Sequence, residues 1–142
     1  MNRPIIFLAP LLLLGACQPG GDTATGAPAQ AFDGISEEET IYLTGTEPFW
    51  GGEIKGSKAQ YSTPENQDGT TFVVERFAGN NGLAFTGKID GGNFDLTVTP
   101  GECSDGMSDR SYPFAATLKV GEEQRSGCAW TDRQPFTGPE NP

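Results

Sequence analysis

Apolar and polar residues alternate along the chain from Ile41 onward, in short runs separated by turns. Phe94, Leu96 and Val98 alternate with polar neighbours, and the run from 112 to 120 repeats the pattern. Successive side chains of a strand point to opposite faces, so this period of two predicts strands with one buried face. Because no amphipathic helical stretch longer than two turns interrupts the pattern, we expect an all-β fold.

Turn residues divide this region into eight short strands. Asp68-Gly69, Asn81-Gly82 and Asp90-Gly91 are typical of hairpin turns, and such short connections imply antiparallel pairing of neighbouring strands. The strands are expected at 41–44, 49–55, 59–62, 71–77, 83–89, 93–99, 112–120 and 124–130. The predicted fold is a small antiparallel up-and-down barrel or sandwich over residues 41–131.

The first residues indicate export. A basic start is followed by an apolar run from Ile5 to Leu14, which as a helix would cover about 15 Å and is too short to cross a bilayer. Residues 1–16 are therefore predicted to be a signal peptide. Leu-Gly-Ala before Cys17 resembles a bacterial lipobox, so we expect Cys17 to carry the lipid. The alternative is an ordinary cleavage near Ala16 that leaves Cys17 free. Gln18 favours an outer-membrane anchor that faces the periplasm.

The flanks of the β region are expected to be without fixed structure. Residues 17–40 are rich in Gly, Ala, Pro and Thr and nearly devoid of large apolar groups, which predicts a flexible linker behind the lipid. Residues 132–142 are predicted to be a disordered tail. The domain therefore lies between a tether and a short tail.

Cys103 and Cys128 are the two cysteines left once Cys17 carries lipid. In an oxidising compartment an even pair is most simply a disulfide, and the loop it closes would be worth about 3–4 kcal/mol in the chain-entropy estimate. The chain has no histidine, so zinc lacks ligands and the usual Ser or Cys triads are excluded. No metal or cofactor is expected.

The formal net charge of −10 makes nucleic acid a poor partner and would steer a cationic partner toward the protein. Ordinary solubility of an acidic secreted protein explains the same charge. Carboxylate pairs could support glycoside hydrolysis, yet with this many acidic residues coincidental pairs are inevitable. The protein is not expected to be an enzyme.

Two stretches are denser in functional side chains than the rest. In GTEPFW, residues 45–50, one of the adjacent Phe49 and Trp50 must point inward and the other outward. An outward aromatic side chain beside Glu47 would suit a binding face, whereas packing at the end of the barrel is the structural interpretation.

The second stretch is CSDGMSDRSYPF, residues 103–114. Its functional interpretations are a calcium loop with Asp105 and Asp109, or a ligand pocket formed by Arg110 and Tyr112. Its structural interpretation is a corner in which the cysteine holds the loop and Asp109 or a neighbouring serine caps a bend. In that corner Arg110 ties loop carbonyls and carboxylates together, and Tyr112 starts the next strand. We favour the corner.

GTEPFW, CSDGMSDRSYPF and the closing Gly127-Cys128-Ala129 together resemble a family of uncharacterised proteobacterial envelope lipoproteins, over residues 44–129. The resemblance implies a lipid anchor and no established activity. In layout alone, the chain is also similar to the heat-inducible META-type lipoproteins and to membrane-bound inhibitors of C-type lysozyme.

The expected function is that of a lipid-anchored envelope protein that binds a partner or supports envelope integrity. The alternatives are inhibition of a cationic lysozyme-type enzyme, which the acidic charge would favour, and carboxylate-based hydrolysis of cell-wall glycans.

Replacing the lipidated residue tests the anchor. Because the lipid is the only source of membrane affinity that the sequence predicts, Cys17→Ala should release the protein into the soluble periplasm or block its processing. Fractionation of cells after a high-salt wash measures this. If the variant still sediments with membranes, the lipoprotein interpretation is wrong.

Overall fold

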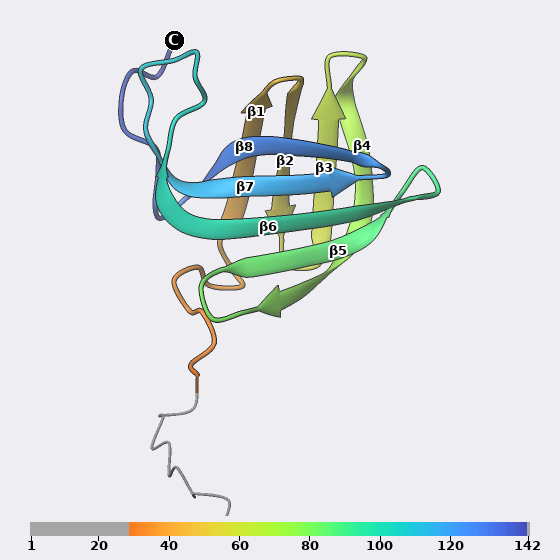
Figure 1. Ribbon diagram of the computed structural model, residues 1–142, viewed down its shortest axis with the longest axis horizontal. Helices are drawn as coiled ribbons and strands as arrows, with labels where there is room; N and C mark the ends of the chain where they lie inside the picture. Colours follow the sequence, from red (N-terminus) through yellow and green to blue (C-terminus); the bar gives the residue numbers. More distant parts are fainter. Residues whose placement is uncertain (1–28, 142) are drawn as a thin grey trace, which may run out of the picture.

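The computed structural model of the protein describes residues 29–141, which form eight strands in up-and-down order (Figure 1). Each strand pairs antiparallel with the next and β8 pairs with β1, so the sheet closes into a barrel. The strands are β1 Thr40–Thr46, β2 Phe49–Lys55, β3 Lys58–Thr63, β4 Asn66–Ala78, β5 Leu83–Ile89, β6 Gly92–Cys103, β7 Tyr112–Val120 and β8 Glu123–Thr131. The all-β prediction is confirmed, and the barrel is the correct choice between barrel and sandwich.

Each expected strand lies within an observed one, and the structure mainly lengthens β4 and β6. No helix in residues 29–141 is long and apolar enough to cross a membrane. The predicted signal peptide, 1–16, and Cys17 lie outside the described residues.

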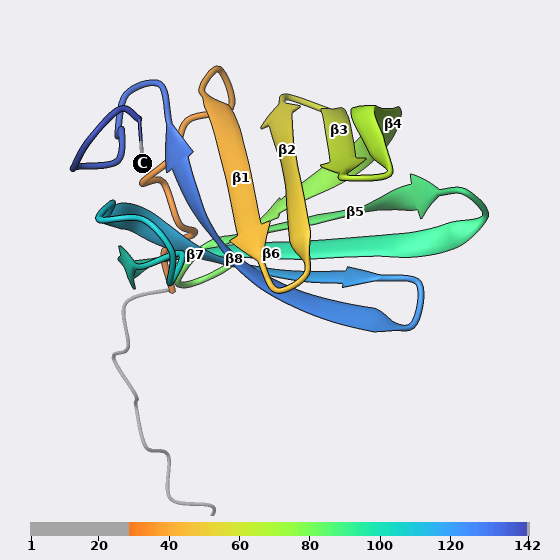
Figure 2. The ribbon, with the colours of Figure 1, turned by 90° about the horizontal axis from the view of Figure 1, so that it is seen from above.

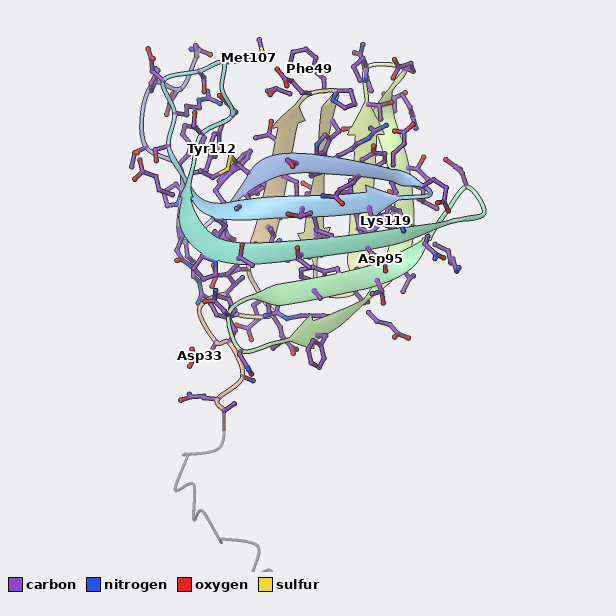
Figure 3. All side chains as sticks on the ribbon, in the orientation of Figure 1. Asp33, Phe49, Asp95, Met107, Tyr112 and Lys119 are labelled. Carbon is purple, nitrogen blue, oxygen red and sulfur yellow. A yellow bond between two sulfur atoms is a disulfide. The ribbon has the colours of Figure 1, made fainter. Side chains whose placement is uncertain are left out.

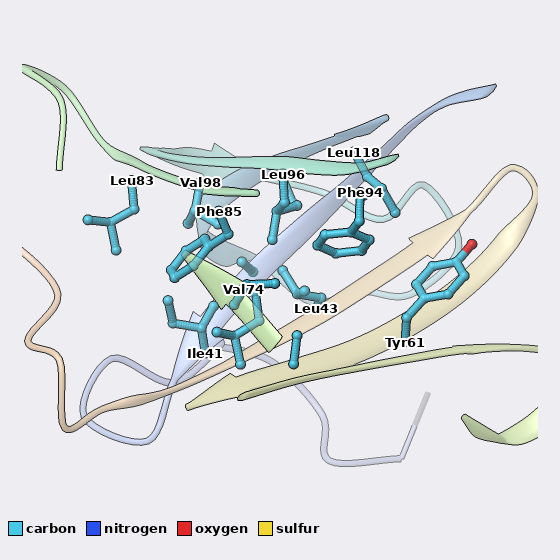
Figure 4. Close-up of a cluster of buried hydrophobic side chains, with 14 of the residues drawn as sticks. Ile41, Leu43, Tyr61, Val74, Leu83, Phe85, Phe94, Leu96, Val98 and Leu118 are labelled. Carbon is cyan, nitrogen blue, oxygen red and sulfur yellow. The ribbon is translucent and has the colours of Figure 1, made fainter. Parts of the chain in front are cut away.

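Alternation along the strands places one set of side chains inside the barrel (Figure 4). Leu96 of β6 is opposite Phe85 of β5 on one side and Leu118 of β7 on the other, and all three are at most 1 % exposed. Burial of each such side chain contributes about 1.5–3 kcal/mol. The interior of the barrel is therefore a packed core.

The segment before β1 closes one end of the barrel. Residues 32–39, here called the N-terminal plug, insert Ile35 into the core, where it is 1 % exposed. Arg76 of β4 donates to the carbonyl of Ile35 at 2.6 Å, and buried Glu39 accepts from the Thr131 hydroxyl at 2.6 Å. The predicted flexible linker, 17–40, is therefore wrong for the plug. Two large apolar residues in a polar run, Phe32 and Ile35, are too few to give a periodic signal, which is why the sequence did not reveal the plug.

The C-terminal segment also packs on the barrel. Thr137 and Ser111 exchange two backbone hydrogen bonds of 2.8 and 2.9 Å, and the ring of Phe136 contacts those of Tyr112 and Trp130. The prediction of a disordered tail over 132–142 is therefore wrong for the part around Phe136. One aromatic residue fixes this segment, without any repeated pattern.

Removing the plug's apolar contact should destabilise the barrel. Ile35→Ala deletes a buried side chain and should lower the free energy of unfolding by about 2–5 kcal/mol. Val73→Ala is the matched control, because Val73 is 72 % exposed on β4 and should change stability by less than about 0.5 kcal/mol. Urea titration followed by tryptophan fluorescence measures both variants. Equal effects would mean that the plug does not contribute to the core.

Candidate functional site

The two dense sequence stretches meet at one corner of the barrel. GTEPFW spans the end of β1, the β1–β2 turn and the start of β2, and residues 104–111 form the β6–β7 loop. The hydroxyl of Thr46 donates to the carbonyl of Asp105 at 2.8 Å and so joins turn to loop. Phe49 at the start of β2 and Met107 from the loop lie at the same edge of the molecule and are 52 % and 69 % exposed (Figure 3). Glu47, in the same turn, is also exposed.

Asp105 organises the loop from within. One of its carboxylate oxygens accepts from the backbone N–H groups of Met107 and Ser108 at 2.9 and 2.8 Å. The other accepts from the hydroxyls of Ser108 and Tyr112 at 2.7 and 3.1 Å. The hydrogen bonds from the Ser108 side chain and backbone hold the pKa of Asp105 well below its ordinary value. This loop is the corner that the sequence favoured, and Asp105 caps its bend.

Arg110 ties the loop to the C-terminal segment. Its guanidinium donates to the carbonyl of Pro139 at 2.8 Å and to that of Glu140, and its central carbon lies 4.3 Å from the centre of the Phe136 ring. The expected partners, carbonyls and carboxylates of the loop itself, are not the ones it uses. Asp109 is exposed and does not cap the bend, because Asp105 already accepts from the N–H groups there.

Tyr112 begins β7, as predicted, and is 2 % exposed. Its ring lies against Trp130 and Phe136, with centroids 5.3 and 5.7 Å away. Tyr112 therefore packs outside the main core and does not line a ligand pocket.

The disulfide between Cys103 and Cys128 is present, with a Cα–Cα distance of 5.7 Å. It joins the end of β6 to β8, so the loop that follows Cys103 starts from a fixed point on the barrel wall. The predicted pairing is confirmed.

Trp50 points inward and Phe49 outward, as adjacent strand residues must. Trp50 is 4 % exposed, and its indole N–H donates to the carbonyl of Ser126 at 3.2 Å. A Cβ on Gly45 would lie 1.9 Å from the indole nitrogen, and one on Gly127 would lie 2.2 Å from a β1 carbonyl. Glycine at both positions is therefore required for the indole to fill the space between β1 and β8.

A groove of about 620 Å3 lies over the seam of the barrel, the place where β1 and β8 meet. β1 pairs with β8 only over Ile41–Thr44 and Cys128–Thr131, and beyond this point the β7–β8 hairpin turns away from β1 and β2 (Figure 2). The groove is bounded by the β1–β2 turn, by the Cys103–Met107 part of the loop and by the outer side of β7 and β8. Its volume is in the range of ordinary ligand sites.

Acidic groups dominate the corner beside the groove. Glu47 and Asp105 line it, and the exposed Glu102 and Asp109 flank the loop. Arg110 is the nearest base in the loop, and its donors are directed to the C-terminal carbonyls. Residues 29–141 contain no group of three acidic, cysteine or histidine side chains placed to hold a metal ion. The calcium interpretation therefore has no support here.

Sequence reasoning missed three residues of this site. Thr46 and Met107 lie inside the two dense stretches, so attention to all their positions would have included them. Ser126 contributes its backbone, and no side-chain signal could have identified it.

The chain matches no protein-family model, no curated protein and no solved structure. The resemblance to uncharacterised envelope lipoproteins stays a prediction.

Changing Asp105 tests the corner. Asp105→Asn loses the charged acceptor of four hydrogen bonds and should lower the free energy of unfolding at pH 7 by about 1–3 kcal/mol. Because folding lowers the pKa of Asp105, its stabilisation is present above the ordinary aspartate pKa of about 3.9 and is lost as pH falls below it. The difference in free energy of unfolding between wild type and variant should therefore become smaller in acid.

The measurement is thermal unfolding between pH 7 and pH 2, with Asp109→Asn as the control in the same loop. The control should be nearly silent, because Asp109 is exposed. If the difference in stability between wild type and Asp105→Asn stays constant down to pH 2, the carboxylate charge is not what holds the loop.

Proposed function

We propose that this protein is a lipid-anchored lipoprotein of the cell envelope and that its barrel binds a protein partner at the groove. The lipobox-like sequence before Cys17 supports the anchor. The observation that carries the binding role is the hydrogen-bonded junction between GTEPFW and the β6–β7 loop. This junction holds Phe49 and Met107 exposed beside a groove.

The exposed side chains are presented by an ordered frame. Thr46 bonds the turn to the loop, Asp105 holds the loop internally, and the disulfide fixes its base. An interface that is already ordered loses less conformational entropy on binding. Exposed aromatic and methionine side chains are those enriched at protein interfaces. A protein is therefore the partner that this surface suits best.

Binding fits this groove better than hydrolysis does. A glycoside hydrolase needs one carboxylic acid with a raised pKa to protonate the leaving group. Of the two carboxylates that line the groove, Asp105 has a lowered pKa and accepts hydrogen bonds on both oxygens. Glu47, the other carboxylate of the lining, is exposed to solvent in a turn.

Inhibition of a cationic lysozyme-type enzyme is the second candidate. It is favoured by the acidic side chains around the loop and by the net charge of −10, which would attract a basic enzyme. Salt-sensitive inhibition of such an enzyme in a cell-wall clearing assay would distinguish this role from binding of another envelope protein.

Photo-crosslinking in intact cells tests the binding surface. With p-benzoylphenylalanine in place of Phe49, ultraviolet light should give a discrete adduct of the full-length protein. The same replacement at Phe77 is the matched control, because that residue is 68 % exposed on β4, away from the groove lining.

The adduct formed from position 49 should weaken several-fold when Met107→Ala is added, because the second rim contact is then lost. Adducts of equal yield from positions 49 and 77, or none from position 49, would contradict the proposed binding surface.

A further inference from the structure

The groove contains the unpaired edge of a β-strand. β8 pairs with β7 over Glu123–Ala129, whereas β1 covers its other side only from Cys128 to Thr131. Among the described residues, no strand pairs with the seam side of β8 between Glu123 and Gly127. Three of the five residues of this edge line the groove: Gln124, Ser126 and Gly127.

The direction of the backbone groups follows from one hydrogen bond. The Ser126 carbonyl accepts from the Trp50 indole, so it faces the seam. In an antiparallel strand the N–H and C=O of one residue point to the same side, and this side alternates with a period of two. The Ser126 N–H and both backbone groups of Gln124 therefore face the groove as well.

Trp50 explains why β1 leaves this edge uncovered. The indole occupies the position where β1 and β8 would otherwise continue their ladder, and Gly45 and Gly127 give it room. Natural proteins normally protect such an edge with Pro, charged side chains or a covering segment. From Glu123 to Gly127 there is no Pro, and the two charged side chains, Glu123 and Arg125, form an ion pair of 2.6 Å with each other. The groove leaves the backbone of this edge open.

We propose that the groove binds an extended segment of a basic protein by strand addition to this edge of β8. The inference deepens the proposed function and rests on it. The edge without a strand partner is about 17 Å long at the usual rise per residue, which suits a segment of about five residues. Because the Ser126 carbonyl already accepts from Trp50, the groups available for pairing are the Ser126 N–H and both backbone groups of Gln124. Main-chain hydrogen bonds to the edge supply affinity in this mode of recognition, and alternate side chains supply specificity.

The acidic side chains near the two ends of the groove favour a basic segment. Glu47 and Asp105 line one end of the groove, and Glu122 lies in the turn at the other end. Arg110 is bound to the C-terminal carbonyls. Lys119, which is paired with Gln124, is not in the groove lining and borders an adjoining depression that also contains Asp95. A segment with alternating lysines would therefore meet carboxylates at both ends without opposing a free cation in the groove lining.

The test uses the folded, non-lipidated Cys17→Ser protein and a defined probe, the peptide Ac-KVKVKV-NH2, in an NMR titration. The amide signals of Ser126 and Gln124 should shift, and their hydrogen exchange should slow. Two control peptides are the acidic Ac-EVEVEV-NH2 and a basic peptide N-methylated at alternate residues, which cannot complete the ladder. Both should bind at least about tenfold more weakly, the equivalent of one or two lost hydrogen bonds or charge contacts.

A matched pair of variants tests the backbone N–H of Ser126 separately from its side-chain hydroxyl. Ser126→Pro removes the N–H that faces the groove and leaves the ladder to β7 intact, since proline is tolerated where the N–H of an edge strand is free. Ser126→Ala removes only the hydroxyl. The proline variant should lose about tenfold in affinity, and the alanine variant should bind like wild type. If the proline variant does not fold, the N-methylated peptide still decides the question.

The outcomes separate this inference from the proposed function. Equal binding of the methylated and unmethylated peptides would overturn strand addition, and so would protection of Ser126 by dimerisation without peptide. Equal binding of acidic and basic peptides would overturn the charge assignment. In each case the crosslink from position 49 would persist if the proposed function is correct. Loss of that crosslink would instead contradict the proposed function.

Discussion

The hydrogen bond between the Trp50 indole and the Ser126 carbonyl determines how this barrel closes. At the seam, β1 and β8 share only four residue pairs before they diverge, and the indole fills the space that follows. Gly45 and Gly127 are the positions at which a side chain would collide with the indole or the opposite strand. The groove outside the seam and the core inside it both depend on this one side chain, because it separates them.

The interpretation of the dense stretches as either a corner or a site was too narrow. Asp105, Arg110 and Tyr112 direct their polar groups and rings to their own loop and to the C-terminal segment, as residues of a structural corner do. The corner in turn fixes the position of Met107 beside the groove. The polar residues are thus structural, while exposed residues between them are available for contact.

Much of the fold could be predicted from the sequence, because alternation and turn chemistry are local signals. Residues such as Phe94 and Leu96 report which face of a strand is buried, and Asp90-Gly91, with φ of 48° and 79°, reports a hairpin turn. The plug and the C-terminal segment could not be predicted, since their apolar contacts come from too few residues to form a period: Phe32 and Ile35 in the plug and Phe136 in the C-terminal segment. The seam depends on where two strands stop pairing, which is a property of the closed barrel and not of either strand alone.

The N-terminal plug also sets the point at which a tether would join the domain. In the view of Figure 3, Asp33 of the plug lies at one end of the barrel, and Phe49 and Met107 lie at the opposite end. With Cys17 lipidated as we propose, the tether would join the domain at the plug, at the end opposite Phe49 and Met107. Tension from a bound partner would then cross the full height of the barrel and reach the chain at Ile35, where core packing and the bond from Arg76 resist extraction. The plug would thus resist the force that a bound partner exerts on the attachment to the membrane.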